Sequence, residues 1–170
     1  MYSLNAPLPP AIREVTATVR PALVGFDAVR ESRSQTLVVK RLGVDDRRAY
    51  LGAADRARDA LRGAPAVEAR IADVGVFEDP PNGRGPVAYL AVESPGLRRL
   101  HDRLAEVIDP IPDLEGGDYV PHVTLARGGD GAAVERLGDV AFEPVTWTVD
   151  ALEFYDARHG ERIETLSLPA

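Results

Sequence analysis

A histidine and a threonine stand one residue apart in the stretch Tyr119–Arg127. The apolar residues Val123 and Leu125 alternate with them, which predicts a strand whose two faces differ. His122 and Thr124 would then point to the same side of the sheet. An imidazole can accept or donate a proton near neutral pH, and a neighbouring hydroxyl can donate a hydrogen bond. We therefore interpret His122 as a candidate acid or base rather than as a hydrogen-bonded core imidazole.

The composition excludes several classes of site. The chain has 170 residues, 45% of them hydrophobic, which is enough for one cored domain or two small lobes that share an interface. It has no cysteine, so disulfides, thiolate zinc sites and cysteine nucleophiles are excluded. No apolar run is long enough to cross a bilayer, and the residues after Met1 lack the pattern of a signal peptide. We expect a cytoplasmic protein with no membrane association.

The charge balance limits the partners. The formal net charge is -7, which disfavours a broad, non-specific grip on a nucleic-acid backbone but leaves a small or terminal phosphate as a ligand. Acidic pairs such as Asp45-Asp46 are typical of helix caps, and no metal-ligand set or cofactor motif stands out. His101 falls on the apolar face of a predicted helix, which predicts packing, whereas His159 beside Gly160 is expected in an exposed turn.

Hydrophobic periodicity and turn residues predict an α+β fold. The expected order mixes strands and helices without strict alternation, in one domain that spans residues 1–170. The predicted strands are 2–6, 26–30, 35–42, 67–77, 87–92, 119–127, 145–155 and 163–168, and the predicted helices are 12–19, 46–61, 95–108 and 132–137. Residues 34–38 and 122–126 can be laid over one another, which suggests a duplication.

Taken in order, these segments resemble the two-histidine (2H) phosphoesterase superfamily, in the branch of 2′-5′ RNA ligase and RNA 2′,3′-cyclic phosphodiesterase. The resemblance rests on the strand end 74–77, the strand 86–90, the helix 97–101 and Pro121-His122-Val123-Thr124-Leu125. It implies a bilobed α+β fold in which each lobe offers one His-x-Thr/Ser strand to a central groove, related by a pseudo-twofold axis. One imidazole would act as the base and the other as the acid, without a metal, while the two hydroxyls would hold phosphate oxygens.

The chain departs from this pattern in its first motif. Aligning the two strands on their shared Thr-Leu places Ser34 at the position of the first histidine, with Thr36 as its partner. A register two residues later, counted from Gly43, places Thr36 at the histidine position and Val38 at the threonine position. Both registers keep the same groove face, because a two-residue slip preserves strand parity. Neither supplies a histidine.

The resulting hypothesis assigns His122 and Thr124 to catalysis, and Ser34, Thr36, Lys40 and Arg127 to phosphate binding. Lys40 is expected on the same strand face as Thr36, toward the groove, and Arg33 and Arg41 would add to a local positive charge. The function would be metal-independent cleavage or ligation of RNA-end or nucleotide phosphodiesters, weakened by the missing imidazole, in a monomer that needs no cofactor. A non-catalytic module that binds phosphate or RNA ends competes with it, and a structural or partner-binding domain is the third alternative.

Overall fold

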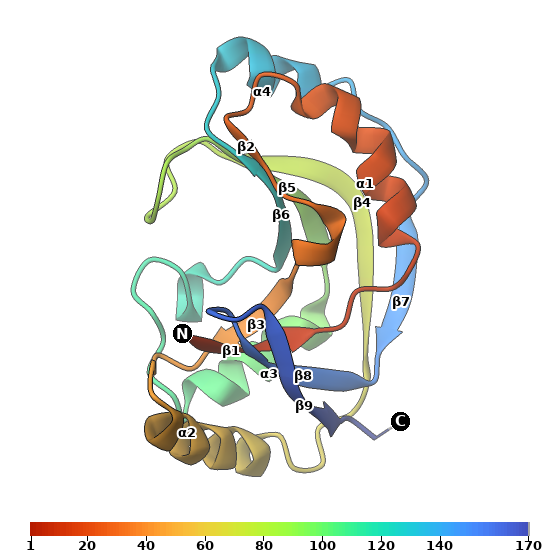
Figure 1. Cartoon of the computed structure of the whole chain (residues 1–170). Helices are drawn as coiled ribbons and strands as arrows, with labels where there is room; N and C mark the ends of the chain where they lie inside the picture. Colours follow the sequence, from red (N-terminus) through yellow and green to blue (C-terminus); the bar gives the residue numbers. More distant parts are fainter. Residues whose placement is uncertain (170) are drawn as a thin grey trace.

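The fold is built on one antiparallel sheet of nine strands, seen in a computed structural model that describes residues 1–169 (Figure 1). The path through the sheet is β7-β4-β5-β6-β3-β1-β8-β9, and β2 pairs with β6 beside it. The sheet curls into a half-barrel with helices outside it, which confirms the predicted α+β class. The strand bounds are Tyr2–Ala6 (β1), Ala28–Val29 (β2), Leu37–Arg41 (β3), Val67–Phe77 (β4), Val87–Glu93 (β5), His122–Arg127 (β6), Val145–Val149 (β7), Ala151–Asp156 (β8) and Glu161–Ser167 (β9).

Helices α1 (Ile12–Val19) and α4 (Gly131–Leu137) lie against one half of the sheet, and α2 (Arg47–Ala60) and α3 (Pro95–Ala105) lie against the other (Figure 1). Three of these helices begin at a side-chain cap, because Asp46, Ser94 and Asp130 each accept a hydrogen bond from the backbone amide three residues later. These caps satisfy amides that have no partner within the helix.

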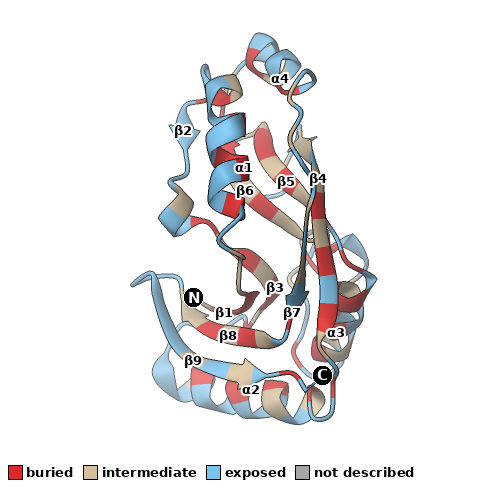
Figure 2. Cartoon of the chain, turned by 90° about the vertical axis from the view of Figure 1, so that its right-hand side faces the viewer, coloured by how far each residue is buried: buried red, intermediate tan, exposed pale blue. Residues whose placement is uncertain are grey.

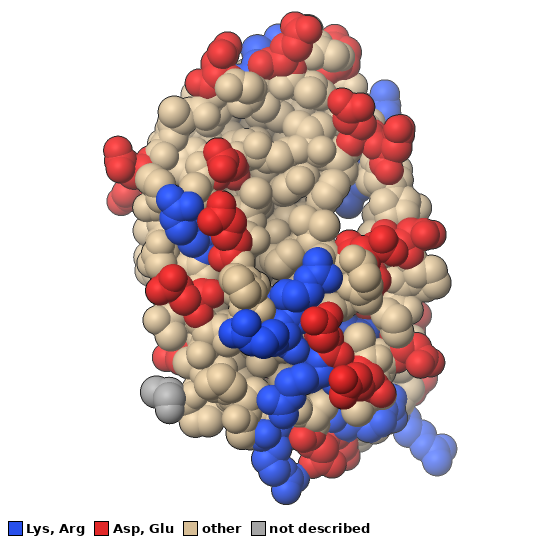
Figure 3. Space-filling view, turned by 180° about the vertical axis from the view of Figure 1, so that it is seen from behind, with Lys and Arg blue, Asp and Glu red and all other residues tan. Residues whose placement is uncertain are grey.

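The core lies between the sheet and its helices, as the bands of buried residues along β4, β5, β8 and α1 indicate (Figure 2). The two central strands β3 and β6 present Leu37, Val39, Val123 and Leu125 to it, and all four are fully buried. The face seen from behind carries Arg side chains interleaved with Asp and Glu (Figure 3). That mixture is what an acidic protein with many exposed ion pairs presents. No helix within residues 1–169 combines the length and apolar character needed to span a bilayer.

One predicted strand was wrong. The segment 145–155 is two strands, β7 and β8, which belong to opposite halves of the sheet. Val149 pairs with Val67 on β4, whereas Ala151 pairs with Ser167 on β9. The alternation of apolar and polar residues continues through Asp150, so periodicity does not reveal where the chain changes its partner strand.

Candidate active site

The two motif strands, β3 and β6, are neighbours at the centre of the sheet. Leu37 pairs with Val123 in antiparallel orientation, and the remaining strands are arranged outward on either side. An antiparallel pair has a local twofold axis between the paired residues, which relates Leu37 to Val123 and therefore Thr36 to His122. The same axis relates Val38 to Thr124.

Both motif strands carry a bulge at the same place. On β3, Lys40 and Val38 pair with consecutive residues of β1, so that Val39 is the extra residue. On β6, Ala126 and Thr124 pair with consecutive residues of β5, which leaves Leu125 as the extra one. The bulges fall at equivalent positions only in the register that equates Thr36 with His122.

Burial follows the same register. From Thr36 to Arg41 and from His122 to Arg127 the sequence of half-buried and buried residues is identical. Each bulge places two buried residues in succession and turns the arginine at the strand end, Arg41 or Arg127, back to the groove. The duplicated strands thus match in backbone, core face and terminal arginine, and differ in the side chains that face the groove.

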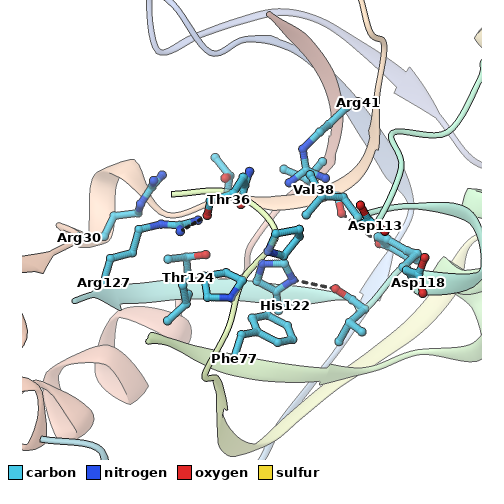
Figure 4. Close-up of a pocket in the computed structure, with 17 residues that line it drawn as sticks. Arg30, Thr36, Val38, Arg41, Phe77, Asp113, Asp118, His122, Thr124 and Arg127 are labelled. Carbon is cyan, nitrogen blue, oxygen red and sulfur yellow. Dashed lines mark hydrogen bonds between the residues drawn. The ribbon is translucent and has the colours of Figure 1, made fainter. Parts of the chain in front are cut away.

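The groove contains a cavity of about 290 Å³ between these strands, here called the motif pocket. Figure 4 shows His122, Thr124 and Arg127 on β6, with Thr36, Val38 and Arg41 across from them. The remaining walls come from Arg30, from the end of β4, from residues 80–82 and from the segment 113–120. The structure therefore brings His122, Thr124, Thr36 and Arg127 of the sequence hypothesis into one pocket.

The imidazole of His122 is held in one tautomer. Its Nδ1 lies 2.7 Å from the carbonyl oxygen of Val120, which can only accept, so Nδ1 carries a proton and the neutral ring has its lone pair on Nε2. Phe77 and Tyr89 pack against the ring edge-on, with centroids at 5.1 and 5.5 Å. Burial lowers the pKa of His122 from its ordinary value, and the charges of Arg41 and Arg127 lower it further. A neutral imidazole with Nε2 available is suited to act as a base.

Arginines supply the positive charge of the motif pocket. Arg30, Arg41 and Arg127 line it, and two of them donate to carbonyl oxygens, Arg30 to Ser34 and Arg127 to Asn82. Burial lowers the pKa of Arg127, and the charges of Arg30 and Arg41 lower it further, although a guanidinium remains charged at any physiological pH. This clustering of like charges favours an anionic ligand.

The prediction that Lys40 faces the groove was wrong. Its side chain is fully buried and points away from the motif pocket, where Nζ lies 2.6 Å from Glu115 Oε2 and 3.1 Å from the carbonyl oxygen of Asp109. The bulge at Val39 is the physical reason, because it reverses the alternation of faces from that residue onward. Arg41 takes the place on the groove face that parity had given to Lys40.

The pair formed by Lys40 and Glu115 anchors one wall of the motif pocket. Glu115 Oε1 also accepts a hydrogen bond from the backbone amide of Arg41, and Oε2 accepts one from Ile111. Burial alone would raise the pKa of this carboxyl, but the hydrogen bonds from Lys40, Ile111 and Arg41 hold the pKa below its ordinary value. The segment 109–118, which carries Asp113 to the pocket, is thereby fixed to β3.

His101 and Tyr119 support the same wall from inside. His101 is fully buried, which confirms its predicted packing, and its ring stacks on that of Tyr119 at 3.9 Å between centroids. Its Nδ1 lies 2.7 Å from Val39 O, while Nε2 accepts from the amide of Gly116. Burial lowers the pKa of His101, consistent with a neutral ring that both donates and accepts. The phenol of Tyr119 donates to the carbonyl oxygen of Val38.

Ser34 does not line the motif pocket. It ends a short 3-10 turn, η2 (Ser32–Ser34), and is exposed. Because Ser34 precedes the strand β3, the alternation of strand faces that predicted its position does not apply to it. It borders an adjacent cavity instead. Sequence reasoning also missed Arg30 as a groove residue. The short strand β2 brings Arg30 beside β6, where its amide donates to Leu125 O, and two strand residues give too little pattern to predict this.

No group of three His, Cys, Asp or Glu side chains within residues 1–169 is arranged to hold a metal ion. The hydrogen-bond donors gathered in the motif pocket are an imidazole, hydroxyls and guanidinium groups, while the carboxylates of Asp113 and Asp118 belong to the wall formed by the segment 113–120. Such donors suit an oxyanion. The arrangement can bind a phosphate group and place one base beside it.

Comparisons with known proteins agree with this geometry. The chain resembles TT0787 of Thermus thermophilus (22% identity, TM-score 0.63, 98% of this chain and 97% of that one). It also resembles LigT of E. coli in complex with 3′-AMP (19%, 0.68, 99% and 98%) and Usb1 of Kluyveromyces marxianus (12%, 0.56, 99% and 96%). At these identities the likeness shows the fold.

Comparison with curated protein sequences gives no match. The profile of the 2′-5′ RNA ligase superfamily matches residues 36–161, which include both motif strands and most of the sheet. The resemblance to two-histidine phosphoesterases is thereby confirmed, and this chain belongs to the 2′-5′ RNA ligase superfamily.

Proposed function

We propose that residues 1–170 act as a single, monomeric 2H phosphoesterase-like domain that binds an RNA end or small nucleotide in the motif pocket and slowly cleaves its cyclic phosphodiester. The observation that carries the proposal is the Nε2 lone pair of His122 in a pocket lined by three arginines. The neighbours LigT and Usb1 support a nucleotide ligand, since they have been crystallised with 3′-AMP and with uridine monophosphate, respectively.

The proposed reaction uses His122 as its base. Nε2 takes a proton from a water molecule as the water oxygen attacks phosphorus, and the bond from phosphorus to one ribose oxygen breaks. Arg41 and Arg127 would hold the phosphate oxygens, with the hydroxyls of Thr124 and Thr36 as further donors. The leaving ribose oxygen takes its proton from solvent, because Thr36 stands where a second imidazole would protonate it. A missing acid costs about 10² to 10⁴ in rate.

A non-catalytic phosphate or RNA-end binding module is the second candidate. Thr36 and Val38, the groove residues of β3, favour this candidate. They offer a hydroxyl and methyl groups but no group that titrates near neutral pH and could serve as a second acid or base. The third alternative, a domain that has lost its groove, would be expected to fill the cavity with side chains. The open volume of about 290 Å³ counts against it.

The test is cleavage of adenosine 2′,3′-cyclic phosphate, and of RNA with a cyclic-phosphate end, in the presence of a chelator. Wild type should cleave slowly, and His122→Ala should lower the rate by about 10² to 10⁴, because the only base in the proposed mechanism is removed. Thr148→Ala, on the exposed face of β7, serves as the control for substitutions on the sheet.

Two results separate the candidates. Equal rates for wild type and His122→Ala would reject catalysis at this site. Calorimetric titration with adenosine 3′-monophosphate would then decide for the binding module if wild type binds and Thr124→Ala binds more weakly. Absence of binding would reject both candidates.

A further inference from the structure

A second cavity borders the motif pocket on the same face of the sheet. It has a volume of about 380 Å³ and shares Arg30, Thr36 and Val38 with the motif pocket, so the two cavities are adjacent. Its other walls are the groove face of β1 and the turn between β8 and β9. We call it the hairpin pocket after that turn.

The two halves of the sheet differ at the place where the hairpin pocket lies. Val38 on β3 and Thr124 on β6 are equivalent positions of the two motif strands. Asn5 on β1 pairs with Val38 and Tyr89 on β5 pairs with Thr124, so Asn5 and Tyr89 are equivalent as well. In the β5 half, Tyr89 stacks on Phe77 at 4.1 Å and fills the space beside His122. In the β1 half the smaller Asn5 leaves the space open.

The floor of the hairpin pocket is polar although it is buried. Ser3 and Asn5 are 6% and 4% exposed, and the hydroxyl of Ser3 donates to Oδ1 of Asn5 at 2.9 Å. This hydrogen bond occupies the amide oxygen of Asn5, so its NH₂ group is the end that remains to donate. Buried polar side chains that border a cavity are costly unless they meet a partner there.

The turn over the hairpin pocket is held rigid by Asp156. Its carboxylate accepts from the amide of Arg158 at 2.9 Å and from Nδ1 of His159 at 2.8 Å, and its carbonyl oxygen accepts from Gly160 at 2.9 Å. Gly160 has a φ of 69°, the left-handed conformation that glycine adopts without strain. The hydrogen bond from His159 lowers the pKa of Asp156, so the carboxylate stays ionised. Because Nδ1 of His159 is bound to this carboxylate, Nε2 is the ring nitrogen that remains for another partner.

Two arginines give the hairpin pocket its positive charge, which the carboxylate of Asp156 within the turn offsets in part. Arg30, Arg158 and His159 line it together with the hydroxyls of Ser34 and Thr36, and none of the described lining residues is Asp or Glu. Guanidinium groups, an imidazole, hydroxyls and an amide together are the donors that bind phosphate oxygens.

We propose that the hairpin pocket binds a second phosphate of the same ligand. Resting on the proposed function, this narrows the ligand class to nucleotides or RNA ends that carry one phosphate for the motif pocket and another nearby. Ser34, which the sequence assigned to the reacting phosphate, would contact the second one instead.

The test is calorimetric titration, at matched ionic strength, with adenosine 3′-monophosphate and adenosine 3′,5′-bisphosphate. Wild type should bind the bisphosphate at least about tenfold more tightly. Arg158→Ala with His159→Gln should bring the ratio of the two affinities close to one, whereas Arg127→Ala should weaken binding of both nucleotides. The control is Arg33→Ala, because this arginine of η2 has a side chain that is 83% exposed and lines neither pocket.

Each outcome decides one claim. If wild type binds both nucleotides equally, the hairpin pocket is not a phosphate site, while binding in the motif pocket stands. If the hairpin variant weakens both nucleotides by the same factor, the turn belongs to the first phosphate site and the proposal is overturned. If neither nucleotide binds, the proposed function falls and the second site falls with it. His159→Gln alone, a conservative change at a residue that is 62% exposed, guards against misfolding of the double variant.

Discussion

Strands β3 and β6 have the same backbone and different chemistry. Each carries a bulge at its fourth residue from the motif start and an arginine at its end, and each presents fully buried aliphatic residues to the core. Facing the groove, β6 offers His122 and Thr124, whereas β3 offers Thr36 and Val38. Because the groove side chains do not pack in the core, they can change without disturbing the fold. Symmetry of the sheet therefore does not imply symmetry of the site.

The largest difference in stability between the strands should lie at the buried position after the bulge, where β3 has Lys40 and β6 has Ala126. Lys40→Met leaves Glu115 as a buried charge without its main partner, and removing one member of a buried pair costs about 3 to 5 kcal/mol. Urea unfolding would measure this loss.

The control for Lys40→Met is Arg62→Ala, which breaks an exposed ion pair with Asp59 and should cost less than about 1 kcal/mol. If Lys40→Met costs no more than Arg62→Ala, the buried pair does not stabilise β3 and the wall of the motif pocket.

The next effect concerns the two terminal arginines. Arg127→Ala should weaken binding of adenosine 3′-monophosphate by about 10- to 150-fold, since a hydrogen bond to a charged group contributes about 1.5 to 3 kcal/mol. Arg41→Ala should cost less, because Glu115 Oε1 lies 3.6 Å from its guanidinium and offsets part of its charge. Calorimetry on both variants, with Arg33→Ala as the control, would refute this ranking if Arg41→Ala were the more damaging.

The smallest effect is a shift in titration. Burial and the two arginines lower the pKa of His122, so the imidazole should protonate in the folded protein at a pH below its ordinary value of about 6.5. Cleavage should accordingly fall only as the pH drops through this lowered pKa. The unfolded chain takes up the proton first, so stability is also lost as the pH falls below about 6.5.

NMR titration of the His122 ring would measure this pKa directly. Arg127→Ala removes one positive charge and should move the pKa upward, toward 6.5. A wild-type pKa at or above about 6.5 would contradict the description of a buried, neutral base.

Much of the scaffold could be predicted from the sequence, because it depends on local patterns. Asp46 and Ser94 cap the helices expected after them, and the long apolar strands β4 and β5 lie where periodicity placed them. The division of 145–155 could not be predicted, since alternation records which face a residue takes but not which strand it meets. Which strand pairs with which depends on the arrangement of the whole sheet.

The candidate site was predictable in part for a related reason. His122 and Thr124 share a face by simple parity, and the structure brings them together with Thr36 and Arg127. Lys40 was misplaced because a bulge adds one residue and reverses parity, and nothing in Leu37-Val38-Val39-Lys40 marks its position. His159 was expected only to be exposed, and its orientation depends on Asp156, three residues away in a turn.

The central claim is that Thr36 and Val38 stand where a second His-x-Thr motif would complete the site. Rebuilding that motif with Thr36→His and Val38→Thr tests it most directly, with Ser34→His as the matched control for the other register. Cleavage of adenosine 2′,3′-cyclic phosphate should rise by about 10² to 10⁴ in the double variant, as a missing acid is restored, and should not rise in Ser34→His. No gain in the double variant, or a gain in Ser34→His alone, would contradict the symmetry of the two strands.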